Sequence, residues 1–185
     1  MTRVKRCRCC KAPFTPARPM QVACGPMCAL DLARAKRIKA ERAQDRAKRE
    51  GLKPLRKLMS EAQTAFNAWI RWRDRNQPCI CCGRTETGVD GLGAHGWDCG
   101  HYRSTGSAPG LRFNEDNAHR QLVLCNRHGA GRAVDYRIGL IARIGLDRVE
   151  ALESDNSVHK WTREELRAIK AKYTAKLREL RAEAS

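Results

Sequence analysis

The feature that most constrains this fold is the spacing of its cysteines. The 185-residue chain has ten of them, and most stand in close pairs separated by two or three residues. Two sulfurs at that spacing can chelate one metal ion from a tight turn. Basic residues and cysteines follow Met1 at once, so no apolar signal segment is recognisable. We therefore expect the chain in the cytosol, where thiols stay reduced and serve as metal ligands rather than forming disulfides.

The first cysteine set predicts a structural zinc site near the N terminus. Its expected ligands are Cys7, Cys10, Cys24 and Cys28. Cys9 is an alternative member of the first pair, but a two-residue spacer lets both sulfurs of Cys7 and Cys10 face one metal ion. Small zinc-stapled modules also suit the composition. With 42% hydrophobic and 31% charged residues, the chain is unlikely to build a large core.

A second set frames residues 79–128. Cys79 and Cys82 form a close pair with Cys81 as an extra thiol, and Cys125 with His128 is the obvious partner pair. A zinc ion held by all four would tie the two ends of this segment together. The sequence thus predicts a second structural zinc site, with the ligands Cys79, Cys82, Cys125 and His128.

The net charge of +17 is concentrated in the first third of the chain. Residues 1–58 contain 17 Lys and Arg against 4 Asp and Glu, whereas residues 59–185 contain 20 against 16. A basic arm of this kind is typical of proteins that bind nucleic acid by releasing counterions. The alternatives are a solvated helix face or an anionic membrane surface, and no apolar run is long enough to span a bilayer. We expect phosphate contacts from Arg34, Lys36, Arg37 and Lys39.

Hydrophobic periodicity predicts a mainly helical α+β chain. Helices are expected at 29–50, from Pro54 or Ser60 to about Arg75, at 134–144, and from Thr162 to near the C terminus. Short strands are expected at Trp97–Arg103 and His119–Leu124. Capping boxes are expected at Ser60 with Gln63 and at Thr162 with Glu165. The apolar residues expected in the core of the second helix are Leu55, Leu58, Met59, Ala62, Phe66, Trp69 and Ile70. The four tryptophans are expected to pack in the core rather than to stack on bases.

Four polar residues inside the second cysteine set suggest chemistry. Asp98 and His101 lie on the first strand, Asn117 precedes the second strand, and Asn126 opens the helix that follows. This strand–loop–strand–helix order resembles the ββα-metal fold of HNH nucleases. In that resemblance the histidine is the general base, the asparagine holds the histidine-bearing loop, and a divalent cation, expected to be Mg²⁺, binds the scissile phosphate. A phosphodiester needs such parts, because its charge must be offset and a neutral imidazole can accept a proton from water. Asp98 and Asn126 are the candidate contacts for the cation.

Further strings resemble the NinG (Rap) family of lambdoid phages over nearly the whole chain. The most specific are Asp98–Arg103, Leu111–Glu115, Asn117–Gln121 and Cys125–Asn126. The resemblance implies a recombination endonuclease that acts on branched DNA, such as Holliday junctions and D-loops, in the cytosol of a bacterial host. The domains would be a zinc finger at 1–28, a basic helical arm at 29–58, an HNH-like, treble-clef type module with its preceding helix at 59–150, and a C-terminal helix at 151–185.

Two positions depart from the family pattern. Leu122 stands where the family has a zinc cysteine, so either His128, Cys81 or His119 substitutes for it or the affinity for zinc is weaker. Residues 84–97 look longer and richer in glycine than the family's turn, and they carry His95, which we expect to be no ligand. His119 is also a candidate second metal ligand, and at least one of Arg103 and Arg112 is expected to contact phosphate.

Three functions remain open from sequence. The first is a metal-dependent DNA endonuclease, the second a non-catalytic zinc-finger accessory protein of recombination, and the third an RNA-binding factor. Only the first needs the set of Asp98, His101, Asn117 and Asn126. The expected partners are branched DNA and other recombination proteins. A homodimer is attractive because symmetric cleavage of a four-way junction needs two sites, with the helices at 134–144 and 162–181 as candidate contacts.

Overall fold

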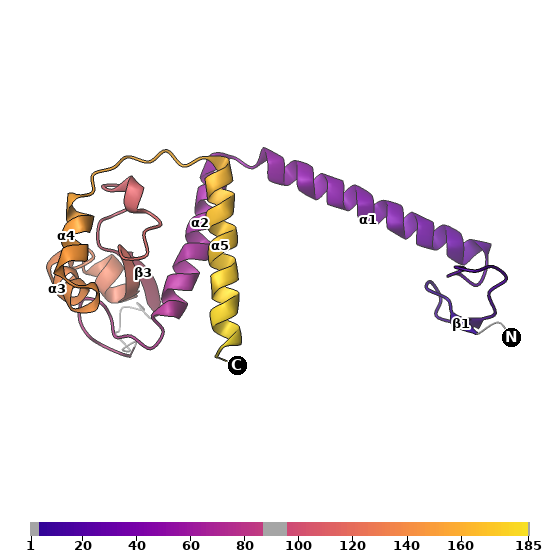
Figure 1. Ribbon diagram of the computed structural model, residues 1–185, viewed down its shortest axis with the longest axis horizontal. Coiled ribbons are helices and arrows are strands. Elements are labelled where there is room, and N and C mark those ends of the chain that lie inside the picture. Colours follow the sequence, from indigo (N-terminus) through magenta and orange to yellow (C-terminus); the bar gives the residue numbers. More distant parts are fainter. Residues whose placement is uncertain (1–3, 87–95, 185) are drawn as a thin grey trace. The chain divides into compact units, whose positions relative to one another are not determined.

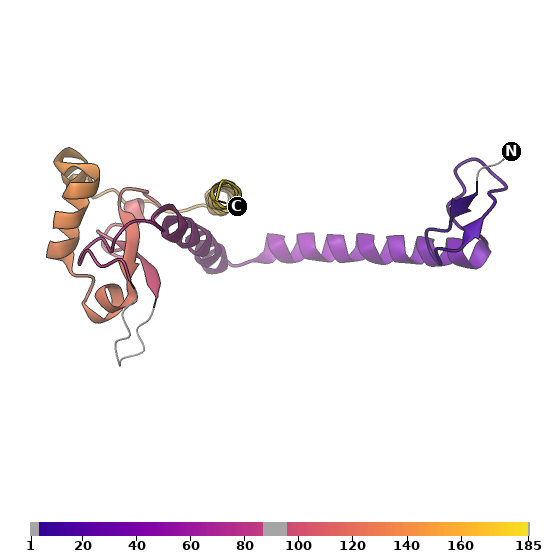
Figure 2. The ribbon, with the colours of Figure 1, turned by 90° about the horizontal axis from the view of Figure 1, so that it is seen from below.

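The computed structural model describes residues 4–86 and 96–184 (Figures 1 and 2). The chain forms two compact units, residues 1–53 and residues 54–185. The first unit ends where Lys53 leaves the helical conformation, with ψ at 130°. Pro54 imposes this break, because proline disfavours helical geometry in the residue before it. The expected boundary between the basic arm and the next module lay at residue 58, five residues further on.

The first unit consists of a small hairpin and one long helix. Strands β1 (Lys5–Arg6) and β2 (Pro13–Phe14) pair antiparallel, and helix α1 spans Pro26–Leu52. Pro26 starts the helix, where its missing N–H would be unpaired in any case. No residue of α1 is buried. The helix expected at 29–50 is present. Because it buries no residue, its stability comes from the intrinsic helix preferences of its Ala, Arg, Lys and Glu residues rather than from packing.

The second unit is built around one β-hairpin. Strands β3 (Trp97–His101) and β4 (Ala118–Leu122) pair antiparallel, with Asp98 opposite Gln121. The loop between them contains the short helix η1 (Pro109–Leu111), and a π-helical turn, η2 (Leu124–His128), follows β4. Strand–loop–strand–helix is the order that the sequence predicts. Because side chains alternate along a strand, the hairpin presents different residues to the helices on its two faces.

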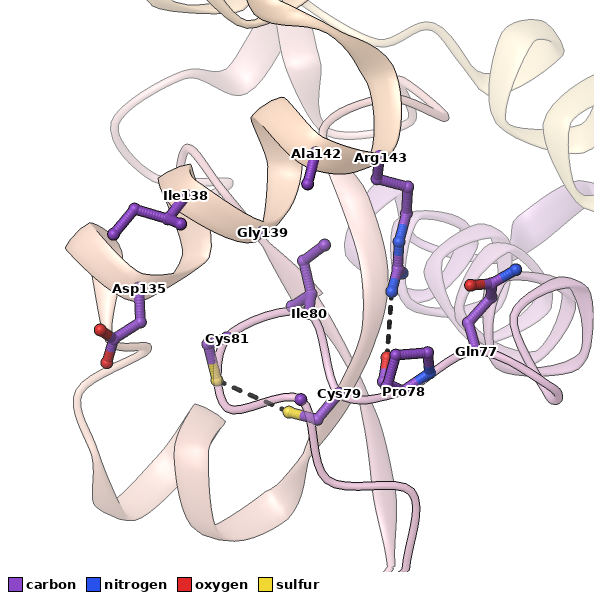
Figure 3. Close-up of a pocket in the computed structure, with 11 residues that line it drawn as sticks. Gln77, Pro78, Cys79, Ile80, Cys81, Asp135, Ile138, Gly139, Ala142 and Arg143 are labelled. Atoms are coloured by element: carbon purple, nitrogen blue, oxygen red, sulfur yellow. Dashed lines mark hydrogen bonds between the residues drawn. The ribbon is translucent and has the colours of Figure 1, made fainter.

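Helices α3 (Ala133–Ile144) and α4 (Leu146–Ser154) cover one face. Tyr136 is buried and donates its hydroxyl to the carbonyl of Gly100 at 2.9 Å. Gly139 lies so close to the backbone of Ile80 that a Cβ atom would stand 1.8 Å from the Ile80 oxygen, so only glycine fits (Figure 3). Helix α4 was not predicted from the sequence; it follows α3 directly after Gly145.

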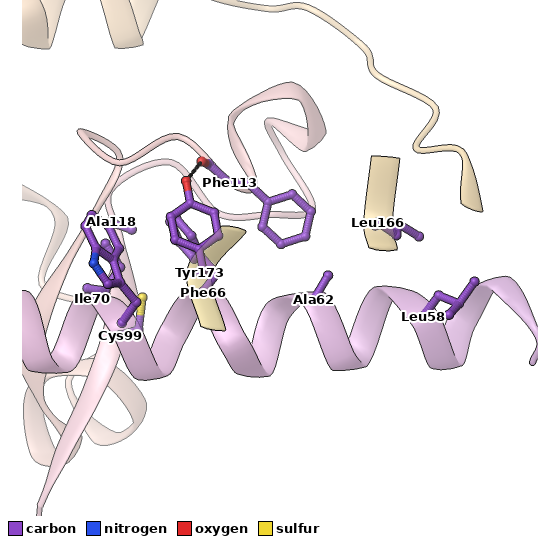
Figure 4. Close-up of a cluster of buried hydrophobic side chains, with 10 residues drawn as sticks. Leu58, Ala62, Phe66, Ile70, Cys99, Phe113, Ala118, Leu166 and Tyr173 are labelled. Carbon is purple, nitrogen blue, oxygen red and sulfur yellow. Dashed lines mark hydrogen bonds between the residues drawn. The ribbon is translucent and has the colours of Figure 1, made fainter. Parts of the chain in front are cut away.

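Helices α2 (Leu55–Arg73) and α5 (Arg163–Ala182) cover the other face and run side by side (Figure 1). Their shared core also takes Cys99, Phe113 and Ala118 from the hairpin region (Figure 4). Phe66 and Tyr173 meet edge to face at 4.9 Å between ring centroids. Burying each such side chain contributes about 1.5–3 kcal/mol. Because α5 completes the core of α2, the segment 151–185 belongs to the same unit as residues 59–150.

The core residues predicted for α2 are largely confirmed. Of the two capping boxes predicted in the chain, the one at Ser60 and Gln63 is wrong. The buried residues of α2 are Leu58, Ala62, Phe66, Trp69 and Ile70, whereas Leu55 is exposed. Ser60 lies inside the helix and does not cap it, because α2 begins directly after Pro54. Thr162 and Glu165 form the expected capping box of α5. None of the helices in the described residues is both long and apolar enough to cross a membrane.

Candidate functional site

The first cysteine cluster has the geometry of a metal site. The Sγ atoms of the four cysteines predicted as ligands, Cys7, Cys10, Cys24 and Cys28, all lie within 4.8 Å of one another. Cys24 stands 3.6 Å from Cys10 and 3.6 Å from Cys28. Tetrahedral zinc with bonds of about 2.3 Å to sulfur requires sulfur–sulfur distances of about 3.8 Å. Cys9 is outside the cluster and contacts Asp31 instead. The cluster could hold a metal ion such as zinc.

Backbone donors prepare Cys7 for this role. The buried Cys7 sulfur accepts the N–H of Cys24 at 3.4 Å. Burial would raise the pKa of Cys7, but the backbone N–H groups of Cys24 and Cys10 outweigh it and lower that pKa to about 6. A thiolate is the form that binds metal, so the fold favours the charge state that a zinc site needs.

The second cluster differs from the prediction in one ligand. Its four cysteines are Cys79, Cys81, Cys82 and Cys125, with all Sγ atoms within 4.8 Å of one another. His128 was expected as the fourth ligand, but the structure leaves it exposed at the end of η2. The hydrogen bonds of a π-helical turn span five residues, so three residues after Cys125 do not return to the same side. Cys81, one of the open alternatives, takes the fourth position.

Strand β4 supports this second cluster although it supplies no sulfur. The N–H of Leu122 donates to the Cys79 sulfur at 3.3 Å, and Nε2 of Gln121 donates to the Cys81 sulfur at 3.4 Å. The Cys81 thiol, with help from the Leu122 N–H and against the effect of burial, lowers the pKa of Cys79 to about 4. Leu122, where the resemblance leads one to expect a cysteine, thus contributes its backbone donor. The cluster could hold a second metal ion such as zinc.

The turn of residues 79–82, which we call the knuckle, is held against α3 by the residues before and after Cys79. Nη2 of Arg143 donates to the carbonyl of Pro78 at 3.0 Å, and Cys81 lies on the side of the knuckle that faces α3 (Figure 3). The contact between Gly139 and Ile80 brings the two backbones together. The position of the cluster is therefore set by helix packing as well as by its sulfurs.

Asp98 and Asn126 meet beside the second cluster. Nδ2 of Asn126 donates to Oδ2 of Asp98 at 2.9 Å. Arg127 adds a two-pronged ion pair to the same carboxylate, at 2.8 and 2.9 Å. Burial would raise the pKa of Asp98, but Arg127 and Asn126 lower it, so the carboxylate is ionised at neutral pH. Asn126 directly follows Cys125, and the cysteine cluster therefore positions it. Arg127 was not among the predicted site residues, although a basic residue directly after Asn126 was a signal for it.

His101 lies apart from this pair. It is three residues from Asp98 on the same strand, which corresponds to opposite faces and a separation of about 10 Å along the strand. Its Nε2 lies 3.1 Å from the carbonyl of Arg112, and its ring is 6.0 Å from that of Phe66. Burial lowers the pKa of His101, so the imidazole is neutral at pH 7. The structure therefore separates His101 from Asp98 and Asn126. The expected catalytic set of Asp98, His101, Asn117 and Asn126 does not form one group.

Asn117 braces the loop that follows His101, as the sequence predicts. Its side chain is fully buried. Oδ1 accepts the N–H of Arg103 at 2.8 Å, while Nδ2 donates to the carbonyls of Arg103 and Leu111 at 3.0 and 3.2 Å. Three backbone groups of the loop are thus satisfied by one side chain.

Both arginines of this loop are engaged by the protein. Nη1 of Arg103 donates to the carbonyls of Leu152, Glu153 and Asp155, so Arg103 caps the C-terminal end of α4 instead of facing a phosphate. Arg112 lies beside His101 and donates to Gln63 and to the Thr105 carbonyl. The four basic residues expected to contact phosphate on α1 are exposed: Arg34, Lys36, Arg37 and Lys39.

His119 belongs to the core. It is 3% exposed, and burial together with the nearby Arg73 lowers its pKa to about 3. Its ring packs against Tyr136 at 6.4 Å, and it joins neither of the two cysteine clusters in the described residues. The expectation for His95 falls on residues 87–95, which lie outside the described residues.

Comparisons with known proteins identify the family. A family described as NinG: Bacteriophage Lambda NinG protein matches residues 1–183. Protein ninG of Escherichia phage lambda is 42% identical over 203 residues, covering 98% of this chain and 96% of the relative. Protein ninG of Escherichia phage 933W is 44% identical over 195 residues, covering 96% and 94%. No solved structure matches the chain. The chain therefore belongs to the NinG family of bacteriophage proteins.

Proposed function

We propose that this protein is a metal-dependent DNA endonuclease that hydrolyses phosphodiester bonds in branched recombination intermediates, such as Holliday junctions and D-loops. The observation that carries the proposal is the meeting of Asp98 and Asn126 at 2.9 Å beside the second cysteine cluster. Their hairpin-and-turn setting has the element order of the ββα-metal fold, in which a pair of this kind holds the catalytic cation.

The donor set suits Mg²⁺. This ion prefers oxygen ligands and is often held by only one or two protein groups, with water and substrate phosphate completing its shell. Asp98 supplies an ionised carboxylate. Asn126 supplies an amide, whose oxygen faces the same point once the amide is turned by half a rotation. When bound there, the cation would offset the charge that develops on the leaving oxygen.

Arg127 complements this pair. Its side chain is 66% exposed although it pairs with Asp98. A guanidinium in that position can turn from the carboxylate to a phosphate oxygen, for which its planar fork is well matched. We assign Arg127 to phosphate binding, the role that the sequence predicts for Arg103 or Arg112.

We assign His101 a role in positioning the loop, and not a role at the cation site. The contact of its Nε2 with the Arg112 carbonyl closes the loop that Asn117 braces. Acting as general base would require the substrate to reach the opposite face of β3 from Asp98. The two roles are separable by mutation, because a positioning residue tolerates substitution better than a base does.

The test uses a labelled four-way junction with Mg²⁺ and the full-length chain. We expect Asp98→Ala and Asn126→Ala to lower the cleavage rate about a hundredfold or more while junction binding persists. Asp135→Ala is the matched control, since Asp135 is also an aspartate paired with an arginine, Arg132, at 3.8 Å. If Asp98→Ala cuts as fast as this control, the cation site is elsewhere. If His101→Gln alone abolishes cleavage in a folded protein, His101 is the base.

A second candidate function is a DNA-binding accessory protein without catalysis. The observation that favours it is α1, a 27-residue helix with no buried side chain and an excess of basic residues. Such a helix suffices for binding along DNA. Wild-type protein that binds the junction yet leaves it uncut with Mg²⁺ or Mn²⁺ would establish this reading. Tighter binding to RNA than to junction DNA at equal salt would favour an RNA-binding factor.

A further inference from the structure

An open groove lies in the first unit, between the loop of residues 17–25 and the first turns of α1. Its volume is about 570 Å³. Most of the residues that line it are apolar or small, and they include Met20, Val22, Ala23, Pro26, Ala29 and Leu32. None of the described residues that line it is acidic. We call it the finger groove.

The apolar side chains of the finger groove face solvent. Met20 is 88% exposed and Val22 is 39% exposed, although both are large apolar residues. Pro26 and Ala29 are also exposed, so α1 contributes to the same surface. Exposed apolar side chains that line a groove are typical of surfaces that bind another protein. Methionine suits such a surface, because its flexible thioether adapts to partners of different shape.

The backbone holds Met20 outward in a strained turn. Its φ is +69°, a left-handed conformation that residues with a side chain rarely adopt. Gln21 braces this turn from the next position. Its Oε1 accepts the N–H of Ala17 at 2.8 Å, and its Nε2 donates to the carbonyl of Ala23 at 2.9 Å. A strained residue that its neighbours hold in place is often part of a binding site, and here the turn fixes the backbone from which Met20 projects into solvent.

Positive charge borders the finger groove. Arg18 is one of its lining residues. Lys36 follows Leu32 by four residues, so it lies one turn further along the same face of α1, and it is exposed. Asp31, the acidic residue nearest to Leu32 in the sequence, contacts Cys9 instead. A ligand of this groove therefore meets apolar side chains between two cations, which is complementary to an acidic segment with apolar residues.

We propose that the finger groove binds an acidic, partly apolar peptide segment of another protein. The apolar side chains of the segment are buried against Met20, Val22 and Leu32, and its carboxylates lie beside Arg18 and Lys36. The inference goes beyond the proposed function, because it concerns the first unit alone and holds whether or not the second unit cleaves DNA. It gives the first unit a role in binding a partner protein, in addition to the phosphate contacts expected on α1.

The competing occupant is the phosphate backbone of DNA. It would use Arg18 and Lys36 in the same way, since both are cations. A phosphate backbone, however, offers nothing apolar to Met20 and Val22. The described lining residues of the groove also include no aromatic side chain on which a base could stack. The apolar part of the groove thus favours a peptide, and it is the part that the test must remove.

The experiment measures binding of the full-length chain to a fluorescent synthetic peptide that alternates aspartate with leucine and phenylalanine. A second peptide carries lysine in place of each aspartate, and we expect it to bind more weakly. Met20→Asn should weaken binding of the aspartate peptide about tenfold, because apolar burial is lost while asparagine still tolerates a positive φ. Arg18→Gln should weaken binding and reduce its dependence on salt.

Met27→Asn is the matched control. Met27 is a methionine of the same unit that is 71% exposed and is not among the described residues lining the groove. Thermal melts and metal content verify that all variants are folded. The same variants are assayed for binding to a labelled four-way junction and for its cleavage.

If Met20→Asn binds the aspartate peptide as Met27→Asn does, or if the wild type binds the two peptides equally, the inference is overturned. It is also overturned if Met20→Asn weakens binding of the junction and not of the peptide, since the groove would then be a DNA surface. Cleavage of the junction tests the proposed function separately, because Met20 lies outside the candidate cation site and its variant should cut at the wild-type rate.

Discussion

Replacing Asn117 by alanine should destabilise the second unit severely. The side chain is fully buried and makes three hydrogen bonds to the backbone of Arg103 and Leu111. At about 1 kcal/mol for each bond, the loss is about 3 kcal/mol, and more if the freed backbone groups stay dry. The unit has about 130 residues, for which the unfolding entropy is about 0.28 kcal/mol per kelvin. We therefore expect the melting temperature of Asn117→Ala to fall by about 11 °C.

Differential scanning calorimetry of the full-length chain gives this number directly. Asn156→Ala is the matched control, because Asn156 is exposed and accepts one hydrogen bond from Nη2 of Arg103 at 2.9 Å. Its melting temperature should change by about 2 °C or less. A fall of under about 3 °C for Asn117→Ala would refute the reasoning, since the loop would then not depend on this side chain.

Three further predictions concern the cysteine clusters, the candidate cation site and a buried histidine. Cys81→Ser should lower the zinc content from two ions per chain toward one, whereas His128→Ala should leave it at two; atomic absorption would show an equal loss in both if His128 were the ligand. Asp98→Ala should keep both zinc ions and the wild-type melting temperature within a few degrees, because its carboxylate lies outside the cysteine clusters; loss of a zinc ion would make it structural. Burial lowers the pKa of His119 to about 3. Below pH 6.5 the unfolded chain therefore binds a proton at this residue that the folded chain does not bind. The free energy of unfolding should fall as the pH drops from 6.5 toward 3. His119→Gln should flatten that dependence in denaturant titrations, and an unchanged profile would rule the residue out as its source.

The sequence predicted the parts of this fold that depend on local rules. Close cysteine spacing identified the N-terminal cluster, the Thr162–Glu165 pair located the start of α5, and two short runs on either side of a loop rich in glycine and proline located both strands. These features depend on residues within a few positions of one another. Their physics, which is chelation, capping and turn formation, is contained in the sequence itself.

The features that the sequence did not predict depend on contacts between distant segments. Arg103 caps α4, a helix about 50 residues later that was not expected, so its role as a carbonyl donor had no local signal. Cys81 completes the second cluster, whereas His128 is exposed at the end of η2 and does not join it. The separation of His101 from Asp98 is different, because an odd spacing on a strand already indicates opposite faces.

The adjacency of Cys125 and Asn126 links the structural and the proposed catalytic parts of the molecule. Cys125 belongs to the second cluster, while the next side chain along the chain meets Asp98 at 2.9 Å. Only one peptide unit therefore separates the second cysteine cluster from the candidate cation site, and both residues lie in the short turn η2. A site that must hold a cation to within a fraction of an ångström benefits from such support, because its ligands lose little freedom on binding. A cysteine cluster that supplies no catalytic group would in this way support the residues that are proposed to act on DNA.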